Sequence, residues 1–101
     1  MSARVSGVVT TLNNAATLDD CLASLSFCDE LVVLDSGSHD ATLQIAGRHG
    51  ARIAAQPFAG YGPQKQAAID LASGEWILLL DADGERHAIR HHGLVAGNYL
   101  V

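Results

Sequence analysis

Two aspartates two positions apart, Asp81 and Asp83, follow directly on the apolar run at residues 76–80. In an extended chain, residues two apart point to the same side, so the two carboxylates lie roughly 7 Å apart. At an effective dielectric constant of about 20 they repel each other by about 2 kcal/mol. A bound cation removes that cost, and hard oxygen ligands suit Mg²⁺ or Mn²⁺ bridging to the phosphates of a substrate. The pair predicts a divalent-metal site at the end of a buried strand.

Two further polar clusters follow apolar runs. Residues 11–14 (Thr-Leu-Asn-Asn) come after the first run, and residues 35–38 (Asp-Ser-Gly-Ser) come after the second. Right-handed crossovers bring the carboxyl ends of parallel strands to one edge of a sheet, and ligands bind at that edge where the strand order reverses. We therefore expect these two clusters and the aspartate pair to converge on one site.

The elements that must position these clusters alternate along the chain. Short apolar runs predict four strands, and helical patterns lie between them. The expected strands are residues 5–11, 31–34, 52–55 and 75–80. The three helices are expected to start at Thr17, at Ser38 or Asp40, and at Pro63, and the last two to end near Gly50 and at Gly74. This order predicts an α/β fold with a mostly parallel sheet and flanking helices.

Composition limits the partners. The chain has 101 residues, a net charge of −5 and one lysine, Lys65, which argues against nucleic acid as a partner because that binding needs clustered Lys and Arg. Cys21 and Cys28 are expected to be reduced, buried thiols. No apolar run approaches the roughly 20 residues of a membrane span. The absence of a signal peptide predicts a cytoplasmic protein.

At these residues the sequence resembles the family 2 glycosyltransferases, which have the GT-A fold, a Rossmann-like sheet that binds nucleotide sugars. The matching stretches are residues 8–13, residues 31–38 with Asp40 and Thr42, residues 62–65, and residues 74–83 with their Asp-x-Asp (DxD) motif. The segment from Pro57 to Lys65 most resembles the branch that adds sugars to the lipopolysaccharide core.

The resemblance implies a role for each predicted site residue. Asp35 accepts a hydrogen bond from the nucleotide base, uracil in most relatives, and Thr11 and Asn13 shape the wall of the same pocket.

The rest of the implied site binds the ribose and the diphosphate of a UDP-sugar or related donor. Asp81 lies near the ribose, and Asp83 ligates the divalent metal, Mg²⁺ or Mn²⁺, that holds the diphosphate. Lys65 faces the diphosphate from the start of the third helix, beside its terminal N–H groups.

The implied reaction is inverting sugar transfer to an acceptor hydroxyl, with a glycan or glycolipid of the cell envelope as acceptor. A lipid acceptor implies peripheral contact of the protein with the inner face of the membrane. In the family the catalytic base lies beyond the metal motif, in the acceptor half, so no catalytic residue is assigned here. We therefore expect residues 1–83 to be a nucleotide-sugar-binding half-domain, truncated after the DxD motif, and residues 84–101 to be an atypical, irregular tail.

Three other readings stay open. Residues 78–84 also resemble the first motif of haloacid-dehalogenase phosphatases, although no lysine follows them. The alternation of strands and helices also fits a dinucleotide-dependent oxidoreductase, but the first turn of this sequence lacks the glycine-rich phosphate loop of such enzymes. The chain could also be a non-catalytic nucleotide-binding module or an inactive remnant. Its uncovered apolar surface would then favour a homo-oligomer.

Overall fold

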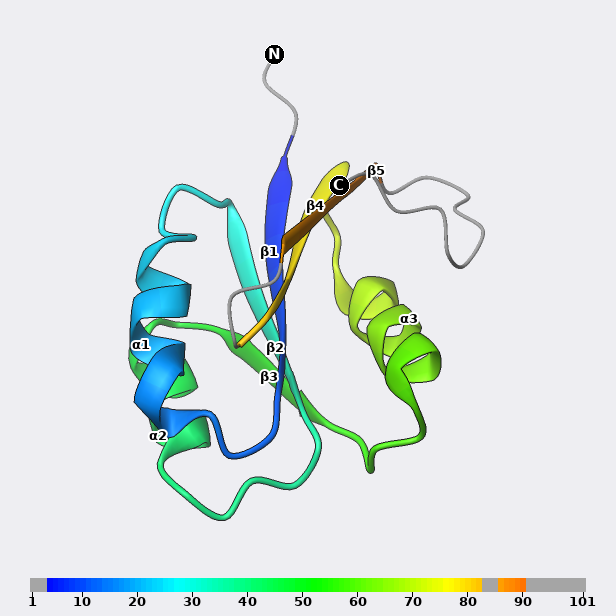
Figure 1. Ribbon diagram of the computed structural model, residues 1–101. Helices are drawn as coiled ribbons and strands as arrows, with labels where there is room; N and C mark the ends of the chain where they lie inside the picture. The colour runs from blue at the N-terminus through cyan, green and yellow to red at the C-terminus, as the bar shows by residue number, and fades with distance from the viewer. Residues whose placement is uncertain (1–3, 83–85, 91–101) are drawn as a thin grey trace.

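The computed structural model describes residues 4–82 and 86–90 of the chain. In this part of the chain, strands and helices alternate through four parallel strands, and a fifth strand follows (Figure 1). The elements are β1 (Val5–Thr11), α1 (Ala15–Ala23), β2 (Glu30–Asp35), α2 (Thr42–Arg48), β3 (Arg52–Ala55), α3 (Tyr61–Leu71), β4 (Trp76–Asp81) and β5 (Arg86–Arg90).

The strands form one sheet in the order β3-β2-β1-β4-β5. Strands β1 to β4 are parallel, and β5 is antiparallel to β4. After β3 the chain crosses back over the sheet through α3 and places β4 on the other side of β1, so the strand order reverses between β1 and β4. The predicted α/β class, the parallel pairing and the switch point are confirmed.

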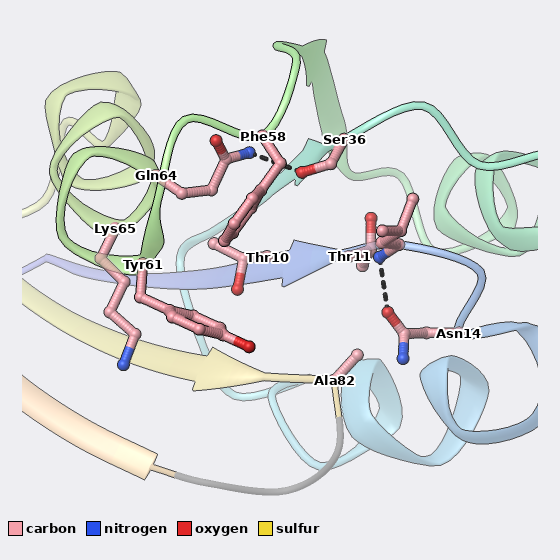
Figure 2. A pocket seen from close by; sticks show the side chains of 10 residues that line it. Thr10, Thr11, Asn14, Ser36, Phe58, Tyr61, Gln64, Lys65 and Ala82 are labelled. Atoms are coloured by element: carbon pink, nitrogen blue, oxygen red, sulfur yellow. Dashed lines mark hydrogen bonds between the residues drawn. The ribbon is translucent and has the colours of Figure 1, made fainter.

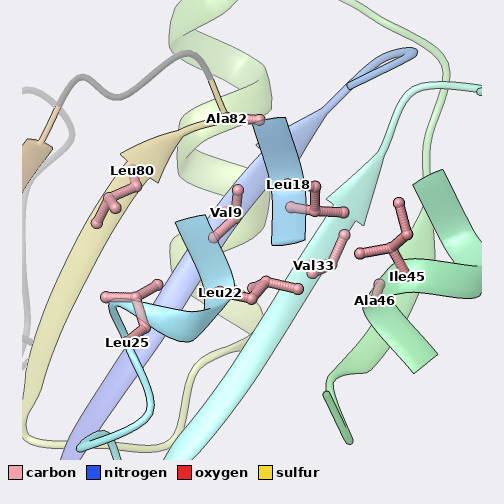
Figure 3. Close-up of a cluster of buried hydrophobic side chains, with 9 residues drawn as sticks. All are labelled: Val9, Leu18, Leu22, Leu25, Val33, Ile45, Ala46, Leu80 and Ala82. Atoms are coloured by element: carbon pink, nitrogen blue, oxygen red, sulfur yellow. The ribbon is translucent and has the colours of Figure 1, made fainter. Parts of the chain in front are cut away.

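Each face of the sheet carries its own apolar layer, because successive side chains of a strand point to opposite faces. Helices α1 and α2 cover one face and α3 covers the other (Figure 1). Val9 packs under α1 with Leu18 and Leu22, all fully buried (Figure 3), whereas Val8 packs under α3 with Ala68. Burying a side chain such as Leu18 contributes about 1.5–3 kcal/mol.

All three helix starts differ from the prediction. Helix α2 begins at Thr42 and not at Ser38 or Asp40. Helix α1 begins at Ala15, because the carbonyl of Asn14 accepts hydrogen bonds from the N–H groups of Thr17 and Leu18 at 3.1 and 2.9 Å. Thr17 therefore lies inside the first turn and does not cap it. Helix α3 begins at Tyr61, so Pro63 is its third residue, where a missing N–H still costs no helical hydrogen bond.

The predicted end of α2 is confirmed, whereas that of α3 is wrong. Gly50, just beyond α2, has φ +73, the left-handed conformation that glycine adopts readily. Helix α3 ends at Leu71, three residues before Gly74. The backbone of Gly74 instead passes close to β1: its N–H donates to Ser6 Oγ at 2.8 Å, and a Cβ there would lie 2.6 Å from that oxygen.

A carboxylate holds the amino ends of the strands together. One oxygen of Glu30 accepts hydrogen bonds from the hydroxyl of Ser6, and from the N–H and hydroxyl of Ser73 at 2.8 Å. Burial opposes ionisation of Glu30, but these hydrogen bonds and the nearby Arg52 hold its pKa below the usual range. The loop before β4 is thereby fixed to β1 and β2 at the end of the sheet opposite the predicted site.

The expectation of an irregular tail after residue 83 is wrong for residues 86–90. Arg86–Arg90 forms β5, with Leu80 opposite Arg86 and Trp76 opposite Arg90. The segment lacks an apolar run, but an edge strand is stabilised by backbone pairing on one side and does not need one. Residues 84, 85 and 91–101 lie outside the described residues.

The two cysteines are reduced thiols and half-buried. Burial, with a contribution from Asp29, raises the pKa of Cys28, so the thiol form predominates at neutral pH. In the part of the chain that the structure describes, no helix has the length and apolarity to cross a membrane.

Candidate functional site

A cavity of about 290 Å³ opens at the carboxyl ends of β1 and β4, beside the start of α3. Figure 2 shows it between the end of β1, the first turns of α3 and Ala82 after β4. It is lined by Thr10, Thr11, Leu12, Asn14, Ser36, Phe58, Tyr61, Gln64, Lys65 and Ala82. This is the sheet edge and the switch point at which the sequence predicted convergence.

The α3 side of the cavity combines aromatic rings with a cation. The rings of Phe58 and Tyr61 meet edge to face, with centroids 5.2 Å apart and planes at 77°. Both are exposed, Tyr61 by 77%. Lys65 follows Tyr61 by one helical turn, and both side chains line the cavity (Figure 2). This side can stack a flat ring and attract an anion.

The buried amide of Gln64 links α3 to the end of β2. Its Nε2 donates a hydrogen bond to Ser36 Oγ at 2.8 Å (Figure 2). Gln64 is 3% exposed, so its orientation is fixed by packing as well as by this bond. Ser36 therefore presents a hydroxyl to the cavity in a fixed direction.

The opposite wall is the turn that follows β1. The N–H of Leu12 donates to Asn14 Oδ1 at 2.7 Å, and the N–H of Asn14 donates to Thr42 Oγ1 at 2.9 Å. Leu12 is half exposed and lines the cavity. The hydrogen bond to Thr42 thus fixes the turn to α2, and the side chain of Leu12 offers an apolar surface to a ligand.

Asp35 lies behind this wall. It is 1% exposed, and its two oxygens accept four hydrogen bonds, from the hydroxyls of Thr11 and Ser38 and from the N–H groups of Gly37 and Ser38, at 2.6–2.9 Å. Burial opposes ionisation, but the hydrogen bonds outweigh it and hold the pKa of Asp35 below its usual range. The carboxylate is ionised at neutral pH and is fully occupied within the protein.

The structure brings part of the predicted site together. Thr11 and Lys65 line the cavity, whereas Asn13 and Asp35 lie outside its lining. Asp81 is the last residue of β4 and pairs with Thr10 of β1, so its backbone reaches the rim of the cavity. Asp83, the predicted metal ligand, lies outside the described residues.

Eight of the ten lining residues received no role from the sequence, and four of them lie at the end of β2 and around the start of α3: Ser36, Phe58, Tyr61 and Gln64. All four lie within the stretches that resemble the glycosyltransferases. Phe58 and Tyr61 lie three positions apart around Gly60, shortly after a strand. This spacing is the sequence signal that could have predicted an aromatic wall on the α3 side of the cavity.

Comparisons with known proteins agree with this architecture. The sequence model described as glycosyl transferase family 2 matches residues 6–90. The chain belongs to glycosyl transferase family 2. The predicted family is therefore confirmed, and the match extends through β5, beyond the DxD motif where the predicted half-domain ends.

Two curated relatives are named as glycosyltransferases. An uncharacterised glycosyltransferase of Rickettsia bellii is 36% identical over 86 residues, which cover 84% of this chain and 29% of the relative. The lipopolysaccharide core biosynthesis glycosyltransferase LpsC of Rhizobium meliloti is 36% identical over 84 residues, 78% of this chain and 31% of the relative. The chain thus spans about 30% of the length of these family members.

Solved structures identify the fold as GT-A. Glucosyl-3-phosphoglycerate synthase from Mycobacterium tuberculosis in complex with UDP superposes with a TM-score of 0.70 and 32% identity, over 81% of this chain and 34% of that one. The same enzyme with Mn²⁺, UDP and glucosyl-3-phosphoglycerate gives 0.69 and 31%, over 80% and 34%. This chain corresponds to about a third of the length of that enzyme.

Proposed function

We propose that this chain is the donor-binding part of an inverting family 2 glycosyltransferase, and that its cavity binds a nucleotide-diphospho-sugar together with Mg²⁺ or Mn²⁺. The observation that carries the proposal is the cavity at the β1/β4 switch point, which has aromatic and hydroxyl groups on its walls and the only lysine of the chain beside them. A nucleotide has the matching parts: a flat base, a polar ribose and an anionic diphosphate.

We propose the following residue roles, which the lining of the cavity supports for Thr11, Ser36, Tyr61 and Lys65 and the family resemblance supports for Asp81. Thr11 and Ser36 contact the base or ribose on the β1 and β2 side, and Asp81 lies near the ribose. Lys65 faces the diphosphate from α3. Tyr61 offers its exposed ring as a stacking surface, which contributes about 1–3 kcal/mol per base in other nucleotide-binding proteins.

The residues present fit a divalent metal. Asp81 and Asp83 flank Ala82, a lining residue of the cavity, and carboxylate oxygens are hard ligands that Mg²⁺ and Mn²⁺ prefer. Among residues 4–82 and 86–90, no group of three or more His, Cys, Asp or Glu side chains could hold a metal without help. We therefore propose that Asp83 binds the metal jointly with the diphosphate of the donor. The metal would supply Lewis-acid stabilisation of the departing diphosphate.

The acceptor is proposed from the relatives. LpsC is named for lipopolysaccharide core biosynthesis, and this chain carries the Pro57–Lys65 segment that first indicated that branch. We propose a cell-envelope glycan or glycolipid as acceptor and a cytoplasmic site of action, where nucleotide sugars are available. The base that deprotonates the acceptor hydroxyl is not assigned to any described residue.

Calorimetric titration with UDP tests the proposal. Wild-type protein should bind UDP more tightly with MnCl₂ than with EDTA, and Asp83→Asn should remove that difference while leaving the metal-free affinity unchanged. Asp70→Asn, which removes an exposed carboxylate from α3, is the matched control and should behave as wild type. Failure to bind UDP would refute the donor site. Equal affinity with and without metal would refute the metal assignment alone.

The same titration addresses the non-catalytic module. Metal-dependent UDP binding without transfer or hydrolysis of the sugar of UDP-glucose by this chain would favour a binding module, and turnover would favour an enzyme. A homo-oligomer stays a prediction that size-exclusion chromatography with light scattering checks.

A further inference from the structure

Asp35 is a buried carboxylate at the end of β2 for which the cavity offers no ligand contact. An ionised carboxylate has about four lone-pair positions. Hydroxyl groups of Thr11 and Ser38 donate to Oδ1 at 2.6 Å each, and the N–H groups of Gly37 and Ser38 donate to Oδ2 at 2.9 and 2.8 Å. All four positions are filled, so an N–H of a ligand would have to displace a protein donor.

These bonds hold both ends of the turn that forms the β1 wall of the cavity. Thr11 bonds to Asp35 directly. The N–H of Asn13 donates to Ser38 Oγ at 2.8 Å, and that hydroxyl donates in turn to Asp35. Leu12, between the two anchored residues, is a lining residue. Its position therefore depends on a carboxylate that it does not touch.

The backbone of the turn needs such an anchor. Asn13 has φ +53, a conformation that costs free energy for a residue other than glycine and persists where surrounding bonds fix it. Its side-chain Oδ1 also accepts from the N–H of His39 at 2.8 Å. Both bonds join the turn to the loop after β2.

The carboxylate of Asp35 also fixes the part of the cavity wall that Ser36 forms. Ser36 lies between Asp35 and Gly37, whose N–H is bonded to the carboxylate, and its own N–H donates to the carbonyl of Thr11 at 2.9 Å. The backbone on both sides of Ser36 is thus fixed. Its hydroxyl can only face the cavity and Gln64.

We propose that Asp35 is a positioning residue of the nucleotide site, which fixes the turn at residues 11–13 and the hydroxyl of Ser36 without contacting the base. This inference rests on the proposed function of the cavity. It replaces the direct base contact that the family resemblance implies for Asp35.

Two substitutions of Asp35 separate its roles. In Asp35→Asn the amide oxygen can still accept from the two N–H groups, and the amide NH₂ can donate to the two hydroxyls, which can rotate to accept. In Asp35→Ala all four donors lose their acceptor. Asp20→Asn, on the exposed face of α1, changes the net charge equally and is the matched control.

The first readout needs no ligand. In amide hydrogen exchange of the free protein, Asp35→Ala should speed exchange of the N–H groups of Asn13, Gly37 and Ser38 about 10-fold or more, because each depends on the carboxylate. Asp20→Asn should leave these rates unchanged. Unchanged rates in Asp35→Ala would overturn the positioning role. If circular dichroism shows that Asp35→Ala is unfolded, Thr11→Val takes its place, with faster exchange expected at Asn13.

The second readout is base preference. Titrations of Asp35→Asn with UDP and with CDP, both with MnCl₂, should show affinities that fall by the same factor, so that their ratio stays within about 2-fold of wild type. A shift of the ratio by about 10-fold would overturn the proposal, because exchanging an acceptor for a donor matters only where the group touches the base. If wild-type protein does not bind UDP, the proposed function fails, and hydrogen exchange alone decides the role of Asp35.

Discussion

The close approach of Gly74 to β1 makes Gly74→Ala the most informative stability variant. A Cβ at this position would lie 2.6 Å from Ser6 Oγ, 2.8 Å from Ser6 N and 3.0 Å from the carbonyl oxygen of Arg4. The Ser6 hydroxyl could rotate away, but the two backbone atoms belong to β1 and to the residue before it. They can move only if β1 and the start of β4 separate.

The expected loss of stability follows from two contributions. Forcing a methyl group into a packed site costs about 1–3 kcal/mol. Weakening the buried hydrogen bond from the Gly74 N–H to Ser6 Oγ adds about 1 kcal/mol. We expect Gly74→Ala to lower the free energy of unfolding by about 2–4 kcal/mol, a large part of the 5–15 kcal/mol typical of a domain.

Gly47→Ala is the matched control. Gly47 lies in α2, and a Cβ there meets no atom within 4 Å. The same substitution should therefore stabilise the protein by about 0.5–1 kcal/mol, the gain expected for alanine over glycine in a helix. Because both variants add one methyl group, the difference between them isolates the contact with β1.

Urea unfolding followed by circular dichroism measures both variants. The midpoint should fall for Gly74→Ala and rise for Gly47→Ala, with slopes like that of wild type. UDP affinity of folded Gly74→Ala should also fall, because β4 carries Asp81 to its place opposite Thr10. Equal midpoints for Gly74→Ala and wild type would show that β1 and β4 are not held at the distances described, and would refute this reasoning.

Three further predictions concern the cavity and the carboxylates. Lys65→Met should weaken UDP binding at least about 10-fold but spare uridine, which lacks the diphosphate; an equal loss for both ligands in calorimetry would exclude a diphosphate contact. Tyr61→Ala should weaken UDP binding by about 1–3 kcal/mol and Tyr61→Phe much less, since stacking needs the ring and not the hydroxyl; equal losses would exclude stacking. The pKa values of Asp35 and Glu30 are lowered by folding, so the stability that they contribute is present above their unfolded values of about 4 and is lost as the pH falls through the folded values. Urea midpoints between pH 7 and 3 should fall less steeply for Glu30→Gln than for wild type, and parallel curves would contradict this.

Much of the fold could be predicted from the sequence because its signals are local. The four parallel strands are short apolar runs. The stretch from Leu31 to Leu34 is apolar at every position, which predicts a strand covered on both faces of the sheet. The right-handed crossover rule predicted that the carboxyl ends of the four strands share one edge of the sheet, whereas the strand order is known only from the structure. The strand β5 could not be found in this way, since Arg86–Arg90 is polar at both ends and is defined by its pairing with β4.

The helix boundaries were harder because the groups that decide them are not side chains of the helix. Asn14 starts α1 through its backbone carbonyl, which leaves no capping pattern in the sequence. Gly74 was interpreted as a helix end, but its small size serves the contact with Ser6. A glycine looks the same in the sequence whether it relieves backbone strain or makes room for a neighbouring strand.

The candidate site likewise has features that could be predicted from the sequence and features that could not. The edge of the sheet and two lining residues, Thr11 and Lys65, could be predicted from motif and topology. The place of Asp35 behind the wall could not, because a buried, fully bonded carboxylate and a ligand-binding one follow a strand in the same way. Whether the carboxylate of Asp35 is fully bonded depends on the hydroxyl groups of Thr11 and Ser38. Thr11 is distant in the sequence, and Ser38 lies in a loop, so neither contact can be predicted from the residues around Asp35.

The central place of β1 has a consequence for synthesis of the chain. β1 is made first, pairs with β2 early, and receives its other neighbour, β4, only after α2, β3 and α3 have been made. Throughout that interval the nascent chain leaves one edge of β1, which carries Val8 and Val9, unpaired and open to pairing with another chain. Nascent chains in which β4 has not yet emerged from the ribosome should therefore recruit chaperones, and chains in which β4 has emerged should release them.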